Sequence, residues 1–117
     1  MSDLSAEDTK LVTLARATRA RVGAAEGAAV RDENGRTYAA ATVDLPSLHL
    51  AALEVCVAMA IASGSRGLEA AVVLTDTGTP VAGLSAVVDF AGPEVLVHLA
   101  EPSGQGLRSG SAGAPPA

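Results

Sequence analysis

The sequence has 117 residues, of which 49% are hydrophobic and 18% charged, and its net charge is -5. A chain of this size can bury a core of its own, and its single cysteine, Cys56, excludes an internal disulfide. The acidic balance and the lack of a Lys/Arg cluster argue against a nucleic-acid polymer or an anionic membrane as partner. The N-terminal residues lack the basic and apolar regions of a secretion signal, so we expect a cytoplasmic protein.

The first half of the chain predicts a helix and a β-hairpin. Ser5 and Asp8 have capping-box spacing, and apolar residues follow at helical intervals, which predicts a helix over 6–21. The segments 27–31 and 36–42 then flank an Asn-Gly pair, whose residues favour the positive φ angles of a tight hairpin turn.

The central segment predicts a second helix and a buried strand. Pro46 suits the first turn of a helix, Asp44 and Ser47 offer capping oxygens, and Gly64 suits a helix end, so we expect a helix over 46–63. The continuous apolar run 70–75, which contains β-branched residues and is bounded by a turn over 76–80, is typical of a strand that is buried on both faces.

The last third is less regular. Residues 81–90 fit a helix or a strand, and we favour a short helix. The segment 94–99 then predicts a strand parallel to the previous one, because a helical crossover would join the two. These elements predict an α/β fold, a three-layer α/β/α sandwich with a mixed sheet and the order α-β-β-α-β-α-β. The domain would span 1–104, with a flexible Gly/Ser/Pro/Ala tail over 105–117.

Several stretches, together with this order of elements, resemble the small cytidine deaminases over about residues 10–104. The matching stretches are Gly27-Ala28-Ala29-Val30, Glu33-Asn34-Gly35-Arg36, Thr42-Val43-Asp44-Leu45 and Thr75-Asp76-Thr77-Gly78-Thr79-Pro80-Val81. In that family, a helix that opens Cys-Ala-Glu and a later Pro-Cys-Gly-Ala-Cys segment supply three zinc ligands and a catalytic Glu. The resemblance therefore implies the cytidine deaminase fold and indicates where a zinc site would lie.

The sequence differs from the family at the residues that would bind zinc and transfer protons. The resemblance places Ala51, Leu84 and Val87 at the three ligand positions and Leu53 at the position of the Glu. Alkyl side chains have no lone pair with which to bind zinc, and none of them can transfer a proton. We therefore expect no zinc site, no other cofactor, and no deamination by the family's mechanism.

The resemblance also implies a weakened nucleoside site. The family's base-stacking Phe falls at Ala24, and its base- and ribose-binding Asn and Glu fall at Thr42 and Asp44. Thr42 and Asp44 keep some hydrogen-bonding capacity and are our candidate remnant ligand-binding residues. An acidic residue just before a helix is also a common cap, which is the second interpretation of Asp44.

The remaining candidates are Glu54, His49, Cys56 and His98. Glu54 lies in an otherwise apolar helix, and the resemblance places it where the family commonly has an Arg near a subunit contact, so we predict it at an interface. His49 and Cys56 would be about 10.5 Å apart along one helix, too far to share a metal ion. Cys56 has apolar neighbours and is expected to pack as a small hydrophobic residue, whereas His49 and His98 stay unassigned.

The sequence favours a non-catalytic structural or interaction protein that forms a homodimer or homotetramer, or that binds an unidentified protein, because the family buries its apolar helix faces between subunits. Two alternatives remain open: a module that binds a nucleoside, a base or another small ligand in the remnant cavity, and a zinc-dependent deaminase with a relocated site.

Overall fold

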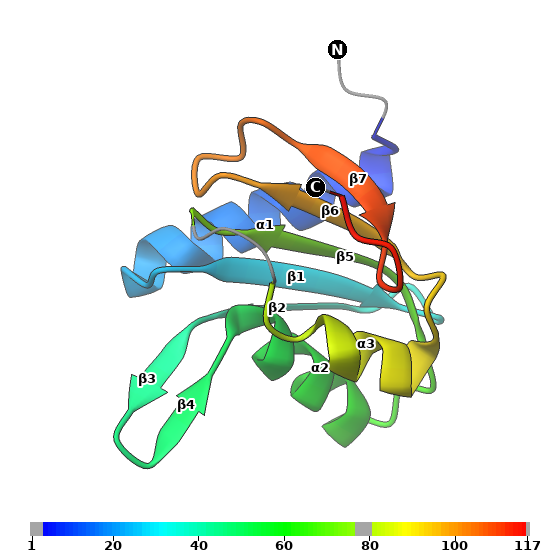
Figure 1. Cartoon of the computed structure of the whole chain (residues 1–117), viewed down its shortest axis with the longest axis horizontal. Helices are drawn as coiled ribbons and strands as arrows, with labels where there is room; N and C mark the ends of the chain where they lie inside the picture. The colour runs from blue at the N-terminus through cyan, green and yellow to red at the C-terminus, as the bar shows by residue number, and fades with distance from the viewer. Residues whose placement is uncertain (1–3, 77–80, 117) are drawn as a thin grey trace.

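In the computed structural model, which describes residues 4–76 and 81–116, a five-stranded mixed sheet lies between helices on both of its faces (Figure 1). The strand order is β2-β1-β5-β6-β7, and only the β5–β6 pair is parallel. The elements in chain order are α1 (Ala6–Val22), β1 (Gly27–Asp32), β2 (Thr37–Ala41), β3 (Val43–Leu45), β4 (Leu48–Leu50), α2 (Ala52–Ala62), β5 (Leu68–Leu74), α3 (Leu84–Ala91), β6 (Leu96–Ala100) and β7 (Arg108–Ser111). The predicted three-layer α/β/α class is confirmed.

Helix α1 covers one face of the sheet. Its N-cap, Ser5, accepts a hydrogen bond from the Asp8 N–H, as the capping-box spacing predicts. Its buried side chains are Asp8, Leu11, Ala15 and Thr18, a helical stripe that packs on the sheet. The helix crosses β1 so closely that a Cβ on Gly27 would overlap the Ala15 carbonyl oxygen. Glycine at this position therefore sets how near α1 can lie to the sheet.

Strands β1 and β2 form the predicted hairpin, although its turn differs from the predicted one. Gly35 has a φ of 81°, whereas Asn34 has a negative φ, so one residue rather than two adopts the left-handed conformation. The buried Asp32 carboxylate organises the turn by accepting hydrogen bonds from the Asn34 and Arg36 N–H groups and from the Ser65 hydroxyl. Burial alone would raise the pKa of Asp32, but these hydrogen bonds outweigh it and hold the pKa below its usual value.

The predicted second helix is correct only in its later part. Residues 43–50 form the β3–β4 hairpin, in which Leu45 pairs with Leu48 across a two-residue Pro46-Ser47 loop, and α2 begins at Ala52. Pro46 therefore occupies a turn rather than a first helical turn, since its fixed φ suits both. Neither Asp44 nor Ser47 caps α2, because both lie in the hairpin.

The prediction of a flexible tail from residue 105 is wrong over Arg108–Ser111. These residues form β7, which pairs antiparallel with β6 at the edge of the sheet. The predicted helix over 81–90 is confirmed as α3, and the strand after it is confirmed as parallel to β5. Most of the turn expected over 76–80 lies outside the described residues. No helix among the described residues is long and apolar enough to cross a membrane.

Candidate functional site at the junction of α2 and α3

The N-terminal ends of α2 and α3 meet on the face of the sheet opposite α1. Helix α2 follows its N-cap residue, Ala51, and α3 follows its N-cap residue, Gly83, which has a φ of 107°. A Cβ on Gly83 would lie 2.9 Å from the Cβ of Leu53, which is closer than two carbon atoms normally approach. Glycine at 83 therefore permits both the left-handed backbone and the close contact between the two helix ends.

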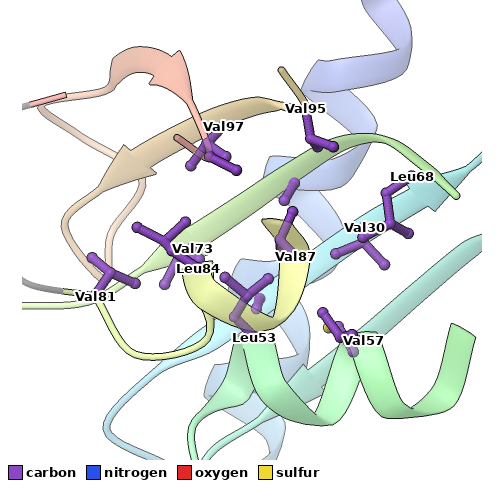
Figure 2. Close-up of a cluster of buried hydrophobic side chains, with 14 of the residues drawn as sticks. Val30, Leu53, Val57, Leu68, Val73, Val81, Leu84, Val87, Val95 and Val97 are labelled. Carbon is purple, nitrogen blue, oxygen red and sulfur yellow. The ribbon is translucent and has the colours of Figure 1, made fainter. Parts of the chain in front are cut away.

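The space between these helix ends is filled by apolar side chains. Leu53 and Val87 are fully buried, and Leu84 is 9% exposed. Figure 2 shows the three gathered where α3 meets α2, with Val73 of β5 close by. All belong to the larger of the two apolar clusters of the structure, which lies between the sheet and the helices α2 and α3. The junction is part of the hydrophobic core.

The comparisons with known proteins place this arrangement in a family. The family model for cytidine deaminase-like domains matches residues 4–104. The chain belongs to the cytidine deaminase-like family. Cytidine deaminase from Burkholderia pseudomallei has a similar structure, with 24% identity, a TM-score of 0.78, and coverage of 97% of this chain and 94% of that chain. Cytidine deaminase from Mycobacterium tuberculosis is 20% identical with a TM-score of 0.70, and 93% of each chain is covered. The search of curated proteins gave no significant match.

The residues at this junction do not fit the zinc ion on which cytidine deaminase chemistry depends. The expected ligand positions carry Ala51, Leu84 and Val87, and the expected position of the catalytic Glu carries Leu53. None of these side chains has an atom that could bind zinc or carry a proton. Within residues 4–76 and 81–116, no three His, Cys, Asp or Glu side chains lie together in a group that could hold a metal ion. The side chains at these positions thus lack the zinc-binding atoms that the chemistry of the fold family requires.

Glu54 lies one residue beyond the position of the missing catalytic Glu, and its carboxylate has a structural partner. Its Oε1 accepts a hydrogen bond from the Ala51 N–H at 2.8 Å. Ala51 has no side-chain oxygen to complete a capping box, so Glu54 supplies the side-chain half of this cap alone. The half-buried carboxylate is therefore satisfied within the protomer, and its place at a subunit interface stays a prediction.

The candidate ligand-binding residues lie at the entrance to the β3–β4 hairpin. The Thr42 hydroxyl accepts a hydrogen bond from the Glu26 N–H at 2.9 Å. Asp44 lies opposite His49 across the hairpin, and its Oδ1 is 2.9 Å from His49 Nδ1. Both side chains of this pair are exposed, so the pair contributes little to stability. Nucleoside binding by Thr42 and Asp44 stays a prediction.

The structure places His49 and Cys56 on different elements. His49 lies on β4, so the expectation that it shares a helix with Cys56 is wrong. Cys56 is fully buried in α2, as expected for a residue that packs as a small hydrophobic group. Burial raises the pKa of its thiol to about 12, which leaves almost no thiolate at neutral pH.

His98 belongs to a polar cluster on the other face of the sheet. Its Nε2 lies 2.8 Å from Asp8 Oδ2, and its Nδ1 lies 2.6 Å from Ser109 Oγ. Arg31 binds Asp8 at 2.8 Å and Glu69 at 2.9 Å. The sequence alone did not indicate these partners. Asp8 does lie in the apolar stripe of the first helix, which is a signal for a buried carboxylate. Ser109 lies in the predicted tail, and no local sequence pattern links it to His98.

Proposed function

We propose that this cytidine deaminase-like protein does not deaminate nucleosides by the family's zinc mechanism and serves as a structural or interaction protein that assembles with copies of itself. The observation that carries this proposal is the apolar filling of the α2–α3 junction by Leu53, Leu84 and Val87. Deamination of this kind needs zinc-bound hydroxide and a carboxylate to move protons, and the side chains at the four expected positions supply neither a zinc ligand nor a proton carrier.

The β3–β4 hairpin supports the choice of a second copy as partner. Within the part of the chain that the structure describes, its two strands pair only with each other, and the hairpin projects from the body of the molecule beside α2 (Figure 1). An isolated two-stranded hairpin is marginally stable in water. Leu45 and Leu48, which pair across its tip, are 57% and 49% exposed. A projecting arm with two exposed leucines can bury them against an equivalent surface of a second protomer, in a symmetric contact.

A double Leu45→Ser, Leu48→Ser variant tests this arrangement. We expect the wild-type protein to have the mass of a dimer or tetramer at low micromolar concentration in size-exclusion chromatography with light scattering, and the variant to shift toward the monomer. Leu14→Ser is the matched control, because Leu14 is 36% exposed but lies on α1. A wild-type monomer, or an unchanged mass in the hairpin variant, would contradict the proposed assembly through the hairpin.

A further inference from the structure

The polar cluster around His98 opens into a cavity of about 930 Å³ on the face of the sheet opposite the α2–α3 junction. The cavity lies between the first turn of α1, the strands β6 and β7, and the loop that joins these strands, and Figure 1 shows the N-terminal end of α1 near β7. Its polar lining comes from Ser5, Asp8, Arg31, His98 and Ser109. Its apolar lining comes from Leu4, Leu96 and Leu107.

The fold brings the serine, the histidine and the aspartate together from three elements. His98 of β6 and Ser109 of β7 are directly opposite each other in an antiparallel pair, so their side chains share one face of the sheet. Asp8 reaches the other side of the imidazole ring from the first turn of α1. The ring is nearly fully enclosed at 2% exposure, whereas Ser109 is exposed. The order is therefore an accessible hydroxyl, a buried imidazole and a buried carboxylate.

The partners determine where the protons lie in this chain of hydrogen bonds. Burial would raise the pKa of Asp8, but the hydrogen bonds from His98 and Arg31 together lower it, so the carboxylate is ionised and only accepts. The Nε2 atom of His98 must then donate its N–H to Asp8. When the imidazole is neutral, its other nitrogen, Nδ1, is an acceptor and is placed to receive the Ser109 O–H.

This polarity is that of a nucleophile, a general base and an orienting carboxylate. The hydroxyl points its proton at the base, and the base is fixed in one tautomer by the acid. The two ring nitrogens exchange roles relative to the serine proteases, in which the serine bonds Nε2. The 2.8 Å ion pair between Arg31 and Asp8 holds the carboxylate in place. Asp8, His98 and Ser109 also line the same cavity, which a hydrogen bond that only joined the two strands would not require.

We propose that Ser109, His98 and Asp8 form a hydrolytic site for small uncharged carboxylic esters. Arg31 is shared by the carboxylates of Asp8 and Glu69, so its charge is already neutralised and does not favour an anionic substrate. The leucine side chains provide an apolar wall for a short acyl chain. This inference goes beyond the proposed function and is independent of it, since it concerns the opposite face of the sheet.

The reaction balances with water as the only other reactant. Ser109 Oγ forms a bond to the carbonyl carbon while its proton passes to His98 Nδ1, and the alcohol leaves with that proton as its C–O bond breaks. Water then gives a proton to Nδ1 as its oxygen attacks the acyl-serine, and the acid leaves as Ser109 recovers the proton.

A fluorophosphonate probe on the full-length wild-type protein tests the site directly. We expect a single adduct by intact mass, mapped to Ser109 by peptide sequencing, and hydrolysis of p-nitrophenyl acetate and butyrate. Ser109→Ala should lose the adduct and reduce hydrolysis by about 100-fold or more. Ser111→Ala, on the same strand and the same face, should retain both.

Histidine variants separate this mechanism from unspecific imidazole catalysis. His98→Gln should abolish the labelling, whereas the exposed His49→Gln should leave it intact. Failure to label Ser109 in wild-type protein, or a hydrolysis rate that is unchanged in Ser109→Ala, would overturn the proposal. Labelling of the wild-type protein does not depend on the folding of any variant. For the variants, circular dichroism melts test whether each one is folded.

Discussion

Replacing Leu53 with glutamate, the residue that cytidine deaminases need at this position, should lower the free energy of unfolding by about 4 kcal/mol or more at pH 7. Leu53 is fully buried and faces the apolar side chains of Leu84 and Val87 (Figure 2). A carboxyl group in such surroundings has its pKa raised by roughly 3 units or more, and each unit corresponds to about 1.4 kcal/mol. Urea unfolding of the variant and the wild type measures the difference.

The loss in free energy of unfolding caused by Leu53→Glu should increase as the pH rises. The folded-state pKa of the new carboxyl is raised, so the folded state holds its proton over a pH range in which the unfolded state has lost it. The destabilisation is therefore greatest above the folded-state pKa and shrinks as the pH falls toward about 4.3, the pKa of an unfolded glutamate.

Two variants at the same position provide the controls. Leu53→Gln introduces a neutral side chain of the same shape as glutamate. The loss in free energy of unfolding that it causes should not change with pH over this range. Leu53→Met conserves the volume and should cost less than about 1.5 kcal/mol. A Leu53→Glu variant as stable as Leu53→Met at pH 7 would show that the junction still accommodates a charged group, which would contradict its assignment to the hydrophobic core.

Replacing Asp32 with alanine should lower the free energy of unfolding by about 3 kcal/mol or more. The Asp32 carboxylate is fully buried and accepts hydrogen bonds from the Asn34 and Arg36 N–H groups at 2.9 Å each, and from the Ser65 hydroxyl. The variant leaves the two N–H groups without their acceptor and removes the partner of the Ser65 hydroxyl, and an unsatisfied buried donor costs about 1–3 kcal/mol. Thermal and urea unfolding report the change.

The contribution of Asp32 should disappear in acid. Its folded-state pKa is lowered, so its stabilisation is complete above the unfolded pKa of 3.8 and is lost as the pH falls through the folded-state value. The exposed Glu33→Ala is the matched control and should cost less than about 1 kcal/mol, although Glu33 accepts a hydrogen bond from the Arg66 N–H. Equal losses in the two variants would mean that the carboxylate of Asp32 does not organise the turn.

The sequence predicted the elements whose signals are local. The Ser5 cap, the Asn-Gly turn and the apolar run before Asp76 each lie within one segment, and α1, the β1–β2 hairpin and β5 follow them closely. Pro46 misled the prediction because its fixed φ suits the first turn of a helix and a two-residue loop equally. Only the pairing of Leu45 with Leu48 distinguishes the two.

The rest depends on contacts that sequence patterns do not encode. Residues 108–111 have no apolar pattern and become a strand because β6 offers them an unpaired edge. The hydrogen bond between Asp8 and His98 joins residues 90 positions apart, so no spacing could reveal it. Only the family resemblance indicates that Ala51, Leu53, Leu84 and Val87 lie near one another, because no pattern in the sequence joins the starts of α2 and α3.

The most direct test of the central claim is the zinc content of freshly purified, untagged protein, measured by mass spectrometry of the metals against protomer concentration. The apolar junction of α2 and α3 predicts far less than one zinc per chain, and no cytidine deamination after zinc is added. One zinc per chain that persists through dialysis, with deamination of cytidine, would contradict this claim and show that other residues hold the metal.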